Sequence, residues 1–142
     1  MTFVFAPGAG AHREHPSVLG LSQELCARGI DVVRFNFWYR EQGKATPDRM
    51  SRLQACYESV ADFAKSLLPG NRMVIGGRSM GGRVASMMVA NRHQCDGLLL
   101  YAYPLLGATG EQRTQHLSDI SVPTLCVCGT RDRLCPVERM NT

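Results

Sequence analysis

Ser79 is the residue whose type and setting point most clearly to chemistry. It stands in Gly77-Arg78-Ser79-Met80-Gly81, between an apolar run and a stretch with helical spacing. A serine at the apex of a tight strand-to-helix turn needs glycine on both sides, because glycine leaves room for the neighbouring strand and helix. This arrangement, a nucleophile elbow, presents the serine hydroxyl for attack on an acyl carbon. The N–H of Met80 could donate to the oxyanion that forms.

The same glycines allow other interpretations. A βα turn with a capping serine has the same G-x-S-x-G pattern. Gly76 and Gly81 have the spacing of a phosphate-binding loop, but the two residues after Gly81 are not the required Lys and Ser/Thr. Gly8-Ala9-Gly10 follows an apolar run, as in a dinucleotide-binding turn, yet Arg13 occupies the third glycine position. We therefore favour the elbow and expect no cofactor.

Acyl transfer by a serine also needs an acid, a base and a second oxyanion donor. Asp132, directly after the last apolar run, stands where the acid that orients a catalytic histidine belongs, although a turn or helix-capping role before Pro136 is the alternative. We expect the backbone N–H of Ala9 to be the second oxyanion donor, with that of Gly10 as the alternative.

The base is the missing member of this set. No histidine follows Asp132 in the sequence. His12 is the histidine nearest the expected crevice, but a base at this position would break the usual order of such triads. His93 and His116 are expected at the surface or at helix ends. The sequence therefore predicts a serine site without its catalytic histidine.

The elements that position these residues alternate between strands and helices. Near-continuous apolar strands separated by helices predict a three-layer α/β/α fold with a parallel sheet of about five strands. Strands are expected at 2–6, 30–37, 73–76, 98–102 and 124–128. Helices are expected from Pro16 to Gly29, from Thr46 to Pro69, at 80–91 and at 111–117.

In such a sheet the ligand crevice lies outside the carboxyl ends of the strands. The loops at these ends carry Ser79, Asp132 and further polar or aromatic residues. We expect these further residues to line a substrate pocket: Gly8, Gly10, Trp38, Tyr39 and Tyr103.

The composition of the chain argues against several other classes of protein. With 142 residues, 44% of them apolar, the chain is expected to be a single domain spanning 1–142. The N-terminus lacks a signal-peptide pattern and no apolar run approaches the roughly 20 residues of a membrane helix, so a cytoplasmic or nuclear protein that does not bind membranes is expected. The net charge of +4 is scattered rather than clustered, which argues against nucleic-acid binding.

The six cysteines are expected to be small buried apolar residues rather than a disulfide framework. Cys126 and Cys128 share one face of a strand, which is not a C-x-x-C ligand pair. No metal site is expected.

Several motifs together resemble the small α/β-hydrolase-like family related to dienelactone hydrolase, which includes predicted bacterial hydrolases, a testis-expressed hydrolase-like protein of animals and the hydrolase-like domain of a chromatin-complex subunit. The resemblance covers nearly all of the chain. The motifs are Pro7-Gly8-Ala9-Gly10, 33–37, 76–83, Tyr103-Pro104 and Gly129-Thr130-Arg131-Asp132.

The resemblance implies the α/β-hydrolase fold, with Ser79 as nucleophile, Asp132 as acid, and Ala9 and Met80 as oxyanion donors. Pro7 departs from the family pattern, because family members usually carry His there. The family also continues past the acid to a loop with the catalytic His, so an incomplete, C-terminally truncated domain is expected.

The function expected from the sequence is that of a serine hydrolase acting on an ester-like or other acyl small molecule, impaired here because the histidine is absent. The alternative is a non-catalytic interaction module that keeps the hydrolase fold and binds a protein partner.

Overall fold

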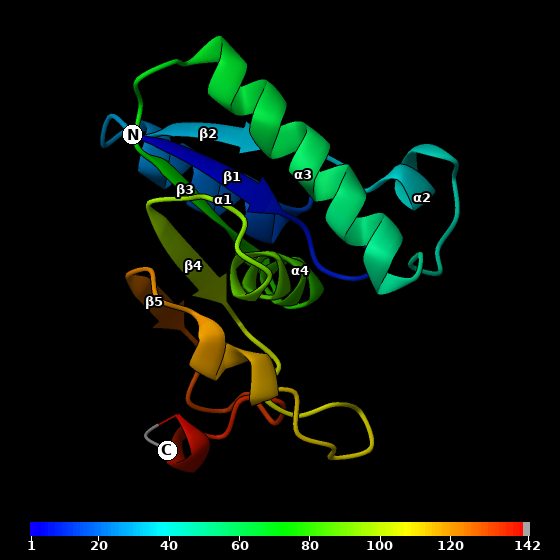
Figure 1. Ribbon diagram of the computed structural model, residues 1–142. Helices are drawn as coiled ribbons and strands as arrows, with labels where there is room; N and C mark the ends of the chain where they lie inside the picture. Colours follow the sequence, from blue (N-terminus) through cyan, green and yellow to red (C-terminus); the bar gives the residue numbers. More distant parts are fainter. Residues whose placement is uncertain (141–142) are drawn as a thin grey trace.

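The computed structural model describes residues 1–140, and within them five strands form one parallel sheet (Figure 1). The order across the sheet is β2-β1-β3-β4-β5, so β3 is central and lies between β1 and β4. This confirms the predicted fold class, and it places the strand that leads to Ser79 at the centre of the sheet. The strands are β1 (Thr2–Ala6), β2 (Asp31–Arg34), β3 (Met73–Arg78), β4 (Gly97–Tyr101) and β5 (Thr124–Val127).

Helices cover the two faces of this sheet unequally. One face of β1 and β3 packs against α1 (Pro16–Cys26) through Phe3, Phe5 and Val18. The other face packs against α3 (Met50–Leu67) and α4 (Met80–Ala90), which contribute most of the larger core cluster. The remaining elements are the one-turn helix α2 (Trp38–Glu41) and the 3-10 helices η1 (Gln115–Asp119) and η2 (Val137–Arg139). Within residues 1–140 no helix is long and apolar enough to cross a membrane.

The segment after β2 differs from the prediction. A strand was expected to reach residue 37, but β2 ends at Arg34. Phe35 and Phe37 turn into the core, where both rings lie against the ring of Tyr57. Aromatic residues favour strands and cores alike, so their sequence pattern did not separate the two.

The predicted helix at 111–117 is also wrong. Residues 111–114 are not helical, and η1 begins only at Gln115. Glu111 instead accepts hydrogen bonds from the Thr109 hydroxyl and the Arg113 guanidinium, at 2.6 Å each, and its neighbour Gln112 forms an isolated bridge with Leu106. These local side-chain contacts compete with helix formation.

β5 forms one edge of the sheet and exposes apolar side chains. Leu125 is 60% exposed and Val127 is 45% exposed. An edge strand with apolar residues facing solvent can pair with another chain.

Candidate active site

Ser79 lies at the junction of β3 and α4 in a strained backbone conformation. Its φ is 50° and its ψ is −114°, in a region that residues with a side chain rarely adopt. Its N–H donates to the Tyr101 carbonyl of β4 at 2.9 Å, and its own carbonyl accepts from the Arg83 N–H of α4 at 3.1 Å. The serine is therefore fixed between strand and helix, as the elbow interpretation predicts.

The glycines beside Ser79 allow the elbow to approach the end of β1. A Cβ on Gly77 would lie 2.5 Å from the Ala6 carbonyl oxygen, and a Cβ on Gly81 would lie 2.6 Å from that of Pro7. Both obstacles are backbone atoms, which cannot rotate away. Glycine is needed at both positions because the backbone on either side of Ser79 contacts the end of β1.

The loop after β1 lies against the serine. A Cβ on Gly8 would be 3.7 Å from the Cβ of Ser79. The Gly10 N–H donates to the Tyr39 hydroxyl at 3.0 Å, so it is already occupied. Ala9, between the two, is exposed, and Met80 begins α4, where the first N–H groups have no acceptor within the helix. Ala9 and Met80 therefore stay the predicted oxyanion donors, while Gly10 becomes a weaker alternative.

Asp132 follows β5 and is half-buried. Since β3 and β5 are parallel strands of one sheet, with β4 between them, Ser79 and Asp132 both follow the carboxyl ends of their strands, on the same side of the sheet. The Asp132 carboxylate accepts from the Leu134 N–H at 2.9 Å, an Asx-turn contact that uses one of its two oxygens. The structure shows the turn role of Asp132, and its role as the acid of the site stays a prediction.

All four histidine rings have partners other than Ser79. The His12 Nε2 lies 2.9 Å from Asn36 Nδ2, and His15 caps α1 through Ser17. The His93 ring lies 3.7 Å from a Glu58 oxygen.

His116 belongs to a buried polar cluster that the sequence did not predict. Its Nε2 lies 2.8 Å from the Ser86 hydroxyl and 3.2 Å from the Tyr103 hydroxyl. Ser86 and Tyr103 are both fully buried. Burial of the ring, together with the nearby positive charge of Arg83, lowers the pKa of His116. The cluster links η1 to α4, and these contacts between distant residues leave no periodic signal in the sequence.

The structure corrects part of the predicted substrate pocket. Tyr39 and Tyr103 are fully buried, with their hydroxyls bonded inside the protein, so they are core residues. The cavity that Tyr103 borders is lined with Leu100 and Cys126, and Ser79 is not part of that lining. Trp38 is 56% exposed and lines a shallow groove with Asp48 and Cys56, away from the elbow. Of the predicted pocket residues, Gly8 is the one that lies against Ser79.

The cysteines are free thiols. The sulfurs of Cys126 in β5 and of Cys128, just after the strand, lie 3.8 Å apart, and burial raises the pKa of Cys126 to about 12. In the part of the chain that the structure describes, no group of three His, Cys, Asp or Glu side chains is arranged to hold a metal ion.

Tyr57, which the sequence analysis did not single out, supports the strand that leads into the elbow. Its buried hydroxyl accepts from the Gly76 N–H at 2.7 Å and lies 2.6 Å from the Val4 carbonyl oxygen. Burial raises the pKa of Tyr57 strongly, so the phenol stays protonated. This contact ties α3 to β1 and β3 just before the serine.

The central elbow, the parallel sheet and the loop placed over the serine are features of α/β hydrolases. A family model described as "Alpha/beta hydrolase domain" matches residues 1–142, and the chain belongs to this family.

Solved structures of similar fold include an alpha-beta serine hydrolase homologue from Coxiella burnetii, with 20% identity and a TM-score of 0.79. Est1E from Butyrivibrio proteoclasticus has 15% identity and a TM-score of 0.78, and a dienelactone hydrolase from Anabaena variabilis has 19% and 0.77. Each comparison covers 99% of this chain, and the chain spans 67%, 71% and 66% of these proteins, respectively. At such identities the likeness establishes the fold.

Proposed function

We propose that this chain is a serine hydrolase domain in which Ser79 attacks the acyl carbon of an ester. The Ser79 oxygen bonds to that carbon and its proton passes to a base or to water, while the alkoxide leaves with the electron pair of the broken C–O bond and takes up a proton to become the alcohol. The N–H groups of Ala9 and Met80 hold the oxyanion, and Asp132 supplies the acid that would orient a histidine. The observation that carries the proposal is the positive φ of Ser79 at a strand-to-helix junction.

Acylation of Ser79 is expected to be slow on this chain, and hydrolysis of the acylated serine slower still. None of the partners described for the four histidines is Ser79. Without a base the serine hydroxyl is a poor nucleophile, although oxyanion stabilisation survives the loss of a triad member. His12 could serve only after its ring left Asn36.

The release of nitrophenolate from 4-nitrophenyl acetate tests this proposal. We expect a slow burst that approaches one equivalent per chain, followed by little turnover. Ser79→Ala should abolish the burst, whereas Ser51→Ala, which removes an exposed serine of α3, should leave it unchanged. An equal burst from the Ser79→Ala variant would contradict the role of Ser79.

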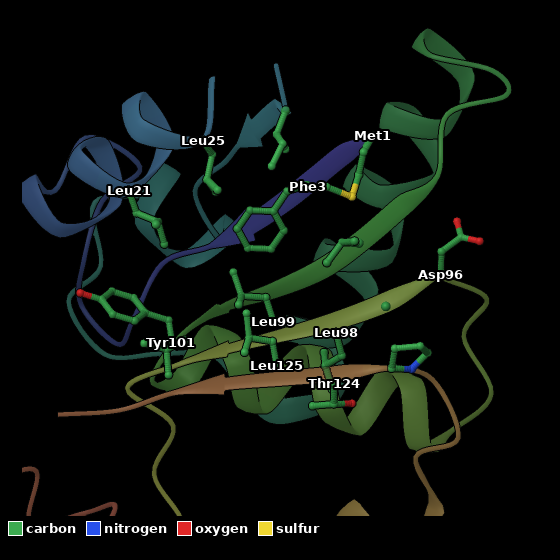
Figure 2. A pocket seen from close by; sticks show the side chains of 15 residues that line it. Met1, Phe3, Leu21, Leu25, Asp96, Leu98, Leu99, Tyr101, Thr124 and Leu125 are labelled. Carbon is green, nitrogen blue, oxygen red and sulfur yellow. The ribbon is translucent and has the colours of Figure 1, made fainter. Parts of the chain in front are cut away.

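The second candidate is an interaction module, and the exposed side of the sheet favours it. A cavity of about 570 Å³ opens on the α1 face, between α1 and β5 (Figure 2). Its lining is largely apolar and includes Leu21, Leu25, Leu99, Tyr101 and Leu125. If Ser79 proves inert and a protein binds over this cavity, this second function replaces the first.

A further inference from the structure

Arg78 immediately precedes Ser79, and its side chain lies beside the same loop as the serine. A Cβ on Gly8 would be 3.5 Å from Nη1 of Arg78 and 3.7 Å from the Cβ of Ser79. The guanidinium nitrogen and the serine Cβ are therefore no farther apart than the sum of these two distances. A small molecule with only a few covalent bonds between two polar groups is long enough to contact both Arg78 and Ser79.

The charge of Arg78 has no neutralising partner among the residues that the structure describes. Other arginines form ion pairs, such as Arg28 with Glu24 and Arg113 with Glu111, both at 2.6 Å. Within residues 1–140 the Arg78 guanidinium has neither an ion-pair partner nor a hydrogen-bond acceptor, although the residue is half-buried. No nitrogen of this guanidinium is among the buried side-chain atoms that lack a hydrogen-bond partner, so the group is open to solvent and can form charge-assisted hydrogen bonds with an anion.

A second guanidinium adds to the positive potential around the elbow. Arg83 lies in the first turn of α4, and its Nε is buried without a hydrogen-bond partner. Its charge contributes to the lowered pKa of His116. Arg83 thus adds a positive charge on α4, the helix that follows Ser79, while Arg78 is the guanidinium that lies beside the Gly8 loop and the serine.

We propose that Arg78 binds a carboxylate of the substrate, so that the preferred substrates are monoesters of short dicarboxylic acids. This inference rests on the proposed function of Ser79. The planar guanidinium matches a carboxylate through two parallel N–H···O bonds, which fixes the second carboxyl group while the ester carbonyl lies at the serine. Arg78 is a specificity residue in this scheme, because it holds the part of the substrate that does not react.

Competition against 4-nitrophenyl acetate measures this preference. Monomethyl succinate carries the free carboxylate, and dimethyl succinate is its neutral counterpart. We expect monomethyl succinate to halve the rate of Ser79 acetylation at an about tenfold lower concentration than dimethyl succinate, the size of one charge-assisted contact in a half-exposed site. Equal potency of the two esters in the unmodified chain would overturn the inference without any variant.

Variants assign the preference to one side chain. Arg78→Gln should remove the preference for monomethyl succinate. Arg78→Lys, which keeps the charge but lacks the planar pair of N–H donors, should keep only part of that preference. Arg72→Gln is the matched control, because it removes the same charge at the opposite end of β3, where Arg72 is exposed. A preference that survives Arg78→Gln, or that disappears equally in Arg72→Gln, would show that Arg78 does not bind the carboxylate.

A binding measurement separates this inference from the proposed function. Ser79→Ala can be titrated with both esters while the amide resonances of Gly8 and Met80 are followed by NMR. If Ser79 is never acylated, the proposed function fails, yet tighter binding of monomethyl succinate that depends on Arg78 still supports the carboxylate site. Equal binding of both esters rejects that site whatever the reactivity of Ser79.

Discussion

Replacing Ser79 with glycine should stabilise the protein, because the serine is held in a conformation that glycine adopts freely. A residue with a side chain in such a sparsely populated region costs about 1–3 kcal/mol. Glycine has greater freedom in the unfolded chain, which takes back about 0.5–1 kcal/mol. Within the described residues the Ser79 hydroxyl makes no hydrogen bond, so its removal loses none.

The net expectation for Ser79→Gly is a gain of about 1 kcal/mol in the free energy of unfolding, or roughly 3 °C in Tm. Ser79→Ala keeps a Cβ and therefore the strain, so its stability should stay within about 0.5 kcal/mol of the parent. Urea unfolding followed by far-UV circular dichroism measures both values.

A serine in ordinary helical conformation supplies the control. Ser59 is exposed in α3, and Ser59→Gly should lower the stability by about 0.5 kcal/mol because glycine is a poorer helix former. If Ser79→Gly destabilises the protein as Ser59→Gly does, Ser79 is not strained and the elbow geometry is wrong.

Three further perturbations test other parts of the structure. Gly81→Ala should lower the free energy of unfolding by about 3 kcal/mol, because the added Cβ meets backbone atoms. Gly20→Ala, whose Cβ meets nothing within 4 Å in α1, should raise it by about 0.5 kcal/mol. The opposite ranking in thermal unfolding would contradict the close packing at Gly81. The lowered pKa of His116 means that folding favours the neutral ring, so the contribution of His116 to the free energy of unfolding is present above about pH 6.5 and is lost as the pH falls through the lowered value. In urea unfolding at pH 5–8, His116→Gln should reduce the dependence of the free energy of unfolding on pH. An unchanged dependence would exclude His116 as its source. The exposed edge at β5 should cause concentration-dependent association in sedimentation velocity, which Leu125→Lys should abolish, whereas a monomeric parent chain would show that the edge does not self-associate.

The sequence predicted the sheet and the elbow well because both have local causes. Buried parallel strands are nearly continuous apolar runs, and a serine between glycines marks a backbone constraint at one position. The place of Ser79 at the end of the central strand followed from these two signals.

The side-chain partners could not be predicted in the same way. Tyr39 and Tyr103 were placed in the pocket because they follow strands, but tertiary packing buries them and bonds their hydroxyls to Gly10 and Ser86. The role of Tyr57 and the unpaired charge of Arg78 also depend on residues far away in the sequence. Such contacts are set by the fold as a whole and leave no periodicity to find.

The location of the acyl group after reaction with 4-nitrophenyl acetate tests the central claim most directly. Digestion of the acetylated chain and peptide mass spectrometry identify the modified residue. We predict one dominant acetyl group on Ser79, absent from the Ser79→Ala chain. Acetylation spread over lysines, cysteines or other serines, with Ser79 unmodified, would contradict the assignment of Ser79 as the nucleophile.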